Sequence, residues 1–393
     1  MRDYEPQKMK QVKFTGIRRV LEKANAMEAA GRPVIHFEVG QPDFVTPKYI
    51  IKAAQAALEA GQTSYTSNYG TLPFRRAIAD KLKRQNGLEV DPATEIMVTV
   101  GGEEAMAAAV LALLDAGDEV LLSDPGYSPY ASMVKIANAV PVYVPLLEAD
   151  NFNYDLAALE KKITGRSRLL ILCSPANPTG TMMDRAGLLK LAEICQKHDL
   201  LVIADEAYEM VVYDDNEHIS FAGLPGMRER TVTIQSFSKS YSMCGWRLGY
   251  IAAVKELLQI IVRAHQNMVL SACNFAQAAG LAALTGPQDD YRAMLAEFDR
   301  RRTLMYEGFV ELGIPCNKPQ AAFYLFPNVS QFGLNGSEFA GRLLDEHGVA
   351  AVPGVEFGPN GRDNIRISYA TSLENCREGM RRIGEFVARL RAE

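Results

Sequence analysis

The sequence predicts an α/β protein with a mostly parallel sheet, helices on both faces of that sheet, and a second, smaller α+β domain. Short apolar segments alternate with amphipathic helical segments from about residue 94 to residue 268, and this alternation is typical of βαβ units. The pattern then changes to helical segments with two isolated short strands. A chain of 393 residues has room for about two or three domains, and its 48% hydrophobic and 23% charged residues are typical of a folded globular protein.

The individual elements are predicted from apolar periodicity. A helix is expected over residues 17–30, because apolar side chains recur there at helical spacing until Gly31 and Pro33 end it. The residues before this helix are expected to form an extended arm. Strands are expected over residues 96–100, 119–123, 169–173, 201–204, 231–235 and 248–253. Further helices are expected up to residue 114 and over about residues 128–138, 188–198 and 255–268.

The smaller domain is predicted mainly from the C-terminal part of the chain. Short strands are expected over residues 323–326 and 364–369, and apolar residues that repeat every three or four positions indicate a closing helix. We assign residues 48–289 to a large domain, and residues 1–47 and 290–393 to a small domain with the N-terminal arm. Clefts between two such domains commonly bind small molecules.

Charge and composition exclude several classes of function. A net charge of −5 argues against a nucleic-acid partner. The six cysteines form no CxxC pair and the five histidines have no metal-ligand spacing, so no metal site is predicted. The longest apolar runs reach about half of the roughly 18 residues that a membrane span needs, and no signal peptide is recognisable. We therefore expect a cytoplasmic enzyme with no membrane partner.

A lysine follows one of the predicted buried strands. Residues 236–240 read Ser-Phe-Ser-Lys-Ser, so Lys239 lies between small hydroxyl residues. Poor solvation there would favour the neutral amine that forms a Schiff base, which makes Lys239 a candidate nucleophile. The alternative is a surface lysine in a serine-rich loop. A nicotinamide dehydrogenase is disfavoured, because no G-x-G-x-x-G follows a strand.

Two polar residues follow other predicted strands. Asp205 comes directly after the apolar run of residues 201–204, at a carboxyl end where doubly wound sheets bind ligands. A carboxylate there needs a cationic partner, which would be a protonated ring nitrogen or, alternatively, an arginine or lysine of the core. Asn177 lies in a rigid turn that contains prolines and a glycine, and its alternative is an ordinary turn asparagine.

Two further motifs are candidates for binding anions. Gly101 and Gly102 join a predicted strand to a helix, whose N-terminal N–H groups are suited to a phosphate; the alternative is an ordinary tight turn. Arg366 lies between Ile365 and Ile367 in a predicted strand, so its side chain points to the face of the strand opposite to theirs. Its alternative is a solvated strand arginine.

These motifs together resemble a known family. Asn-Pro-Thr-Gly at 177–180, Asp-x-Ala-Tyr at 205–208, Ser-x-Ser-Lys at 236–239 and Gly-Trp-Arg-Leu-Gly-Tyr at 245–250 occur in the order found in class I/II aminotransferases of pyridoxal-phosphate fold type I, similar to aspartate and aromatic aminotransferases. The resemblance covers essentially the whole chain. It implies pyridoxal 5′-phosphate as cofactor, a seven-stranded-type sheet in the large domain, amino acid and 2-oxo acid substrates, and a homodimer.

The resemblance also implies roles for single residues. Lys239 would carry the cofactor as a Schiff base and then move a proton between the substrate Cα and the cofactor. Asp205 would keep the pyridine nitrogen protonated, so that the ring can accept electrons. Asn177 and Tyr208 would hydrogen-bond the ring 3-oxygen. Lys239, Asp205 and Tyr208 are thus the candidate catalytic residues.

Other residues would bind the cofactor ring, the cofactor phosphate and the substrate α-carboxylate. Tyr127 would stack on the pyridine ring, and Tyr65 would reach the phosphate from the neighbouring subunit. Arg366 would bind the substrate α-carboxylate through two guanidinium donors, beside Gly40 and Asn177. Further cofactor contacts are expected from Gly101, Gly102, Glu103, Ser236, Ser238 and Arg247.

Two residues depart from the family pattern. Aspartate-preferring members often carry, at the position of Glu103, a lysine that helps to bind the distal carboxylate, so aspartate is a disfavoured donor here. The usual glycine of a Pro-x-Gly-Ala-Phe-Tyr motif is Ala321, and this change is expected to narrow or reshape the substrate pocket.

The leading hypothesis is a homodimeric, pyridoxal-phosphate-dependent aminotransferase that moves an amino group from an L-amino acid to a 2-oxo acid by a ping-pong mechanism. One alternative is a β-lyase, cyclase or oxidase that uses the same cofactor and scaffold. Another is a non-catalytic effector-binding protein, which the complete set of Lys239, Asp205, Asn177 and Arg247 disfavours, as does the lack of a DNA-binding segment.

Overall fold

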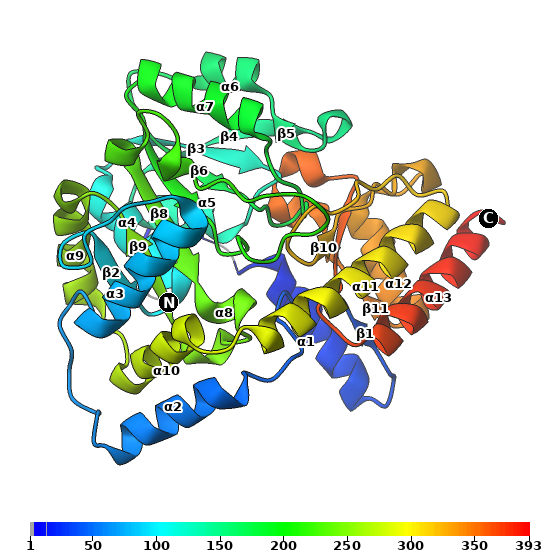
Figure 1. The fold of residues 1–393 in the computed structure, drawn as a ribbon. Helices are drawn as coiled ribbons and strands as arrows, with labels where there is room; N and C mark the ends of the chain where they lie inside the picture. The colour runs from blue at the N-terminus through cyan, green and yellow to red at the C-terminus, as the bar shows by residue number, and fades with distance from the viewer. Residues whose placement is uncertain (1–3, 13) are drawn as a thin grey trace.

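The computed structural model describes residues 4–12 and 14–393, which form a large sheet with a group of short strands beside it (Figure 1). Within these residues the large sheet has eight strands in the order β2-β9-β8-β7-β6-β3-β4-β5. In that order they span Ile96–Thr99, Gly249–Ala252, Thr231–Ser236, Leu201–Asp205, Ser167–Cys173, Glu119–Asp124, Val140–Leu147 and Asn153–Tyr154.

The large sheet is mostly parallel, as the alternation of strands and helices predicts. β8, β7, β6, β3 and β4 pair in parallel from one to the next. β9 is antiparallel to both of its neighbours, and the two-residue β5 is antiparallel to β4 at the edge. The seven-stranded type of sheet is therefore present, with β5 as a short addition.

Helices cover both faces of this sheet because successive strand residues point to opposite sides. Leu169 and Ile171 pack in a core with α4 (Gly101–Leu113), α5 (Pro129–Ile136) and α9 (Lys255–Met268). Leu170 and Leu172 pack on the other side, with α6 and α7. The remaining helices that pack around the large sheet are α6 Leu156–Lys162, α7 Arg185–Lys197, α2 Lys48–Glu59, α3 Leu72–Lys81 and α10 Asn274–Thr285.

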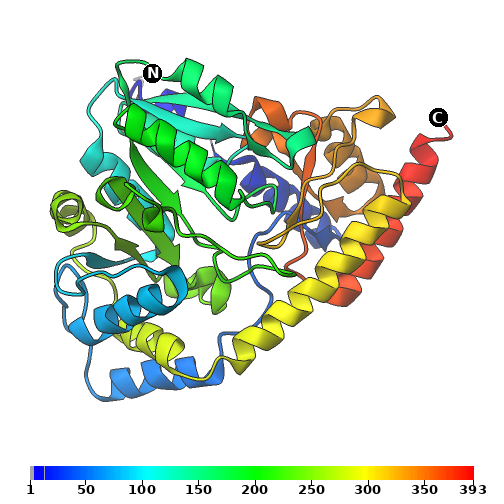
Figure 2. The same ribbon diagram turned by 45° about the horizontal axis from the view of Figure 1, so that its top comes forward.

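The C-terminal part of the chain combines short strands with long helices. β1 pairs in parallel with β11, and β13 lies between β10 and β12 with antiparallel pairing to both. Figure 2 shows α11 and α13 running side by side along this part, and the two helices are in contact. These elements are β1 Ile35–His36, β10 Tyr324–Leu325, β11 Val349–Ala350, β12 Val352–Pro353, β13 Ile365–Ser368, α1 Gly16–Ala29, α11 Asp289–Glu311, α12 Gly336–His347 and α13 Leu373–Leu390.

The proposed division into residues 48–289 and the two chain ends stays a prediction. The pairing of β1 with β11 joins the N-terminal segment to the C-terminal part, in agreement with that division. The hydrophobic core that contains Ile35 of β1 and Val349 of β11 also contains Tyr208 and Val211, which come from residues 48–289. The expected N-terminal arm includes residues 1–3 and 13, which lie outside the described residues, and a 3₁₀ turn occupies Met9–Gln11.

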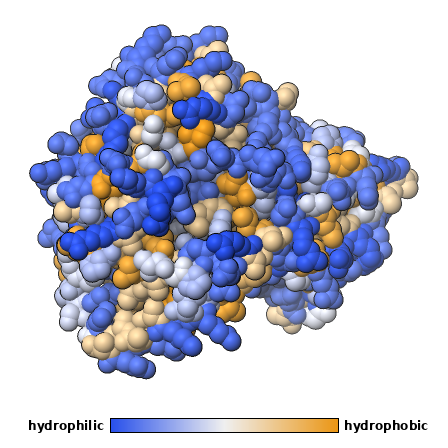
Figure 3. Space-filling model, viewed as in Figure 1, coloured by the Kyte–Doolittle hydropathy of each residue, from blue (hydrophilic) through white to orange (hydrophobic). Residues whose placement is uncertain are grey.

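Several apolar side chains are exposed at the surface. On the face shown in Figure 3, apolar side chains lie among hydrophilic ones in the region of α2, and other apolar side chains are scattered over the rest of this face. Three exposed apolar residues lie on α2 or close to its ends in the sequence: Val45, Leu58 and Tyr65 are 81%, 45% and 85% exposed. None of the described helices is long and apolar enough to cross a membrane.

Candidate active site

A cavity of about 510 Å³ opens at the carboxyl ends of β6, β7 and β8, between the large sheet and the strands β10 and β13. This is the edge at which parallel sheets place their ligands. It brings together residues that the motifs single out: Gly40, Gly102, Glu103, Tyr127, Asn177, Asp205, Tyr208, Ser236, Ser238, Lys239, Arg247 and Arg366.

Lys239 lies inside this cavity rather than on the surface. It belongs to the short helix α8 (Phe237–Ser240), which begins immediately after β8 and is capped by the Ser236 hydroxyl, the acceptor for the Ser238 N–H at 3.2 Å. The half-buried Nζ of Lys239 donates a hydrogen bond to the carbonyl oxygen of Gly40 at 2.7 Å. The alternative of a surface lysine in a serine-rich loop is therefore wrong.

Asp205 ends β7 with its carboxylate at the cavity. It accepts hydrogen bonds from the Tyr130 hydroxyl at 2.6 Å and from the Ala207 N–H at 3.1 Å. Burial raises the pKa of Asp205, and these hydrogen bonds oppose that rise. Among residues 4–12 and 14–393, no ion pair to Asp205 is formed, so the alternative of a core arginine or lysine partner is wrong. The carboxylate lacks the cation that its position requires.

The glycine turn after β2 lies against Arg247. Gly101 has φ = 77°, and a Cβ on it would lie 2.6 Å from Nη2 of Arg247, so a side chain there would displace the guanidinium. The exposed Arg247 donates from Nη1 to the Cys244 carbonyl at 2.9 Å. Gly102, at the N-terminus of α4, lines the cavity, whereas Gly101 lies just outside it. The N-terminus of α4, whose N–H groups are suited to an anion, and the Arg247 guanidinium thus meet at the cavity.

Two carboxylates lie in the first turn of α4, and both are hydrogen-bonded. Glu103, which lines the cavity, accepts from the Tyr127 hydroxyl at 2.5 Å. Burial and the Glu103 charge raise the pKa of Tyr127 well above its ordinary value, so the hydroxyl stays a donor. Glu104 accepts from the Val100 N–H at 3.0 Å and pairs with His265 at 2.9 Å.

Arg366 projects from β13 into the other end of the cavity and is 1% exposed, so the alternative of a solvated strand arginine is wrong. Its Nη1 donates to Oδ1 of Asn177 at 3.2 Å and its Nη2 to the Glu38 carbonyl at 2.5 Å. Its Nε has no hydrogen-bond partner among the described residues. The guanidinium is 4.7 Å from the centre of the Tyr324 ring. A buried guanidinium with a spare donor is suited to a carboxylate ligand.

Sequence reasoning missed two tyrosines of the cavity. Tyr130 holds Asp205, and Tyr324 shares a 2.7 Å hydrogen bond with Tyr208. A Cβ on Gly40 would lie 2.2 Å from the Tyr324 hydroxyl oxygen, so this position requires glycine. Tyr130 and Tyr324 belong to motifs that the sequence singles out, but their contacts are long-range and carry no local signal.

Two residues named from the sequence lie elsewhere. Tyr65 is 85% exposed and does not line the cavity of its own chain. Ala321 is fully buried and does not line the cavity, so its expected effect of narrowing or reshaping the pocket stays a prediction. Ala321 instead forms an isolated bridge with Val212.

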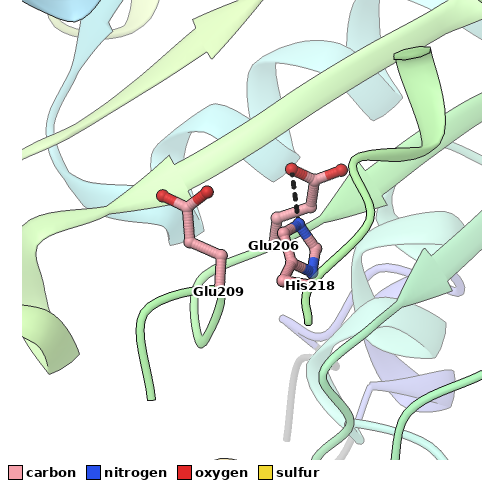
Figure 4. Close-up of side chains that lie close together, drawn as sticks. All are labelled: Glu206, Glu209 and His218. Carbon is pink, nitrogen blue, oxygen red and sulfur yellow. Dashed lines mark ion pairs between the residues drawn. The ribbon is translucent and has the colours of Figure 1, made fainter. Parts of the chain in front are cut away.

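Glu206, the residue after β7, forms a cluster with Glu209 and His218 (Figure 4). Its ligand atoms are close enough for a metal ion, but protein donors already hold both carboxylates. Lys81 pairs with Glu209, and His218 lies 3.1 Å from Glu206. Further donors to the two carboxylates are Asn86, Gln235, the Ser220 hydroxyl and the Phe221 N–H. This cluster is an internal ionic network.

The family model of aminotransferase class I and II matches the sequence over residues 32–383, which is most of the chain. The chain belongs to the class I and II aminotransferase family. This aminotransferase is 42% identical over 358 residues to the aspartate aminotransferase of Pyrococcus abyssi, covering 90% of this chain and 92% of that one. It is 37% identical to aromatic-amino-acid aminotransferase 2 of Thermococcus litoralis, covering 96% of each chain.

Solved structures agree with this assignment. The aspartate aminotransferase of Thermus thermophilus with maleate is 35% identical and superposes with a TM-score of 0.92, over 98% of this aminotransferase and 100% of that chain. The aromatic aminotransferase of Pyrococcus horikoshii is 40% identical, with a TM-score of 0.89 over 95% and 99% of the two chains. The predicted fold and the predicted activity, transfer of an amino group, are confirmed.

Proposed function

We propose that this aminotransferase holds pyridoxal 5′-phosphate in the 510 Å³ cavity and transfers an amino group from an L-amino acid to a 2-oxo acid by a ping-pong mechanism. One observation carries the proposal: Asp205, a half-buried carboxylate with no ion pair among the described residues, shares this cavity with the amine of Lys239 and the guanidinium of Arg247. A protonated pyridine nitrogen, an aldehyde and a phosphate would complement these three groups. When bound, the cofactor supplies an electron sink for negative charge at the substrate Cα.

In this proposal, Lys239 transfers a proton at the substrate Cα and Asp205 keeps the cofactor ring nitrogen protonated. The amine of Lys239 would hold the cofactor through its aldehyde, and the same amine, once free, would move a proton at the substrate Cα. Its hydrogen bond to the Gly40 carbonyl keeps Nζ directed into the cavity. Asp205 holds a proton on the ring nitrogen, and Tyr130 fixes the orientation of the carboxylate.

The phosphate end is assigned to Gly102, Ser236, Ser238 and Arg247, which line one cavity with the N-terminus of α4. Helix N–H groups and a forked guanidinium are both suited to a phosphate. Gly101 contributes by leaving room for Arg247. Glu103 acts indirectly, through its hydrogen bond from Tyr127, the residue proposed to lie on the cofactor ring.

The substrate end is assigned to Arg366, Asn177 and Gly40. Arg366 would bind the α-carboxylate, and its unpartnered Nε provides a donor that the protein does not use. Asn177 already orients the guanidinium through Nη1, and it is proposed to contact the cofactor 3-oxygen together with Tyr208. Tyr324 would orient the Tyr208 hydroxyl.

A homodimer is part of the proposal. Tyr65 has 85% of its surface exposed and no place in its own cavity, so it is assigned to the phosphate site of a partner copy. The exposed apolar residues on α2 and near its ends, Leu58 and Val45, are consistent with an interface in this region. We also place the enzyme in the cytoplasm, because its six cysteines are free, as expected in a reducing compartment.

The test combines spectroscopy with product analysis. Reconstitution with pyridoxal 5′-phosphate should produce a visible absorbance band that Lys239→Ala abolishes, and the enzyme should convert amino acids only when a 2-oxo acid acceptor is present. Ammonia or pyruvate released without an acceptor would instead identify a lyase or oxidase. A protein that stays colourless would leave only the effector-binding alternative. Sedimentation at several concentrations tests the dimer.

A further inference from the structure

Arg366 contacts the backbone of Glu38, a residue with a buried carboxylate. Glu38 follows β1, is 0% exposed, and receives Nη2 of Arg366 on its backbone carbonyl at 2.5 Å. Its side-chain Oε1 is 2.7 Å from Nδ1 of His36, but its Oε2 has no hydrogen-bond partner among the described residues. The Nε of Arg366 has none either. Two buried groups of opposite charge, each with a spare hydrogen-bonding atom, thus belong to residues that are in contact through the Glu38 backbone.

Glu38 has an electrostatic effect on Arg366. Burial lowers the pKa of Arg366, and the neighbours that oppose this are Tyr324, Tyr208, Tyr127 and Glu38. Of these four neighbours, Glu38 is the carboxylate. A buried guanidinium without a counter-charge is costly, and a nearby carboxylate reduces that cost. The same negative charge opposes the binding of a second carboxylate to the guanidinium.

His36 connects Glu38 to the solvent. Its side chain is 27% exposed, and its Nε2 lies 3.3 Å from Glu28 of α1. The hydrogen bond to Glu38 raises the pKa of His36, with burial acting in the opposite direction. Arg382 of α13, near this segment, donates to the backbone carbonyls of Pro33 and Gly348 and pairs with Glu378 of the same helix at 2.7 Å. Protonated His36 offsets the charge of Glu38, and neutral His36 does not.

We propose that Glu38 is a positioning residue that lowers the affinity of Arg366 for the substrate carboxylate. Protonation of His36 reduces this effect, so the affinity depends on pH. The inference rests on the proposed function, because it takes Arg366 as the carboxylate-binding residue. Affinity for substrate and product carboxylates should then rise as pH falls through the pKa of His36. Because the carboxylate is held equally before and during the reaction, the effect falls on KM rather than on kcat.

The test measures binding without turnover. The probe is 3-phenylpropionate, a carboxylate without an amino group, titrated calorimetrically into holoenzyme between about pH 6 and pH 8.5, the range in which histidine titrates. At the high end, Glu38→Gln should bind the probe about three- to tenfold more tightly than wild type, because it keeps the hydrogen bond to His36 but removes the charge. Its tightening on acidification should begin at a lower pH than in wild type, because loss of the Glu38 charge removes the main group that raises the pKa of His36.

Glu28→Gln is the matched control, since it removes a carboxylate from the other side of His36 and away from Arg366. At high pH, where His36 is neutral, its affinity should equal that of wild type. His36→Gln should keep the wild-type affinity at high pH and lose its pH dependence, and it serves as the test if Glu38→Gln does not fold.

Unchanged or weaker binding in Glu38→Gln would overturn the inference, as would full wild-type pH dependence in His36→Gln. Failure of the proposed function has a different signature, because the probe would then bind wild type and Arg366→Gln equally, or bind neither.

Discussion

Replacing Glu103 by lysine should shift donor preference toward aspartate. Three cations line the cavity, and the proposed function assigns Lys239, Arg247 and Arg366 to the aldehyde, the phosphate and the α-carboxylate. A second substrate carboxylate would therefore meet no unassigned cation of the cavity lining. It would meet Glu103, which is exposed in that lining and already accepts the Tyr127 hydroxyl. The wild type should prefer amino acids without a distal carboxylate.

The size of the effect follows from Coulomb's law. Unit charges about 6 Å apart, at an effective dielectric of about 50 for this open position, interact by about 1 kcal/mol. Glu103→Gln removes one repulsion and should raise the preference for aspartate about fivefold, while Glu103→Lys reverses the charge and should raise it about 30-fold. The neutral variant separates the effect of charge from that of shape.

The assay compares kcat/KM for aspartate and phenylalanine with one common acceptor. The ratio cancels changes in cofactor loading, which affect both donors equally. A wild type that uses aspartate better than phenylalanine, together with an unchanged ratio in Glu103→Lys, would refute the reasoning. Such a result would mean that the distal group of the substrate lies away from α4.

The remaining predictions concern the cavity and its support. Gly40→Ala should lower kcat/KM by about 100-fold or more, because its Cβ would lie 2.2 Å from the Tyr324 hydroxyl oxygen; steady-state kinetics checks this, and near-normal activity would contradict it. Asp205→Asn should lower kcat by about 100-fold or more, yet make the cofactor-free protein more stable near pH 7 in thermal unfolding. Burial raises the folded-state pKa of Asp205, so its ionised form destabilises the fold as pH rises through that pKa. Lys81→Met should cost about 3–5 kcal/mol in denaturant unfolding, because it leaves Glu209 buried without its cation, and a chelator should leave the wild-type stability unchanged.

Strands with continuous apolar runs could be predicted from the sequence, but β4 (Val140–Leu147) was missed. Its sequence contains Pro141 and Pro145, and proline within a run argues against a central strand. β4 tolerates both because it lies next to the edge of the sheet, where the two-residue β5 pairs only with its last residues, Leu146 and Leu147. Position within the sheet is a tertiary property, and local sequence does not contain it.

In the candidate site, too, some residues could be predicted from the local sequence and others could not. Residues at strand ends, such as Asp205 and Lys239, could be predicted because a strand end fixes where they lie. Tyr130 could not be assigned its contact with Asp205, because 75 positions separate the two residues and the contact depends on the order of strands in the sheet. Glu38 was missed for the same reason, since its importance arises only where the segment after β1 meets β13.

The pKa values of two adjacent carboxylates, Asp205 at the end of β7 and Glu206 after it, are shifted in opposite directions. Asp205, the last residue of β7, lines the cavity, while Glu206, the next residue, belongs to the ionic network of Figure 4. Burial raises the pKa of Asp205, whereas at Glu206 the effect of burial is outweighed by His218, Ser220 and the Phe221 N–H, which lower it.

Glu206 is thus paired in the protein itself and contributes to stability, while Asp205 needs a cation that the described residues do not provide. This contrast separates two effects of mutation that are often confused. Neutralising the side chain in the network should destabilise the fold, and neutralising the one at the cavity should stabilise the cofactor-free fold while removing activity. If both variants lost stability equally, the assignment of Asp205 to a cofactor cation would lose its physical basis.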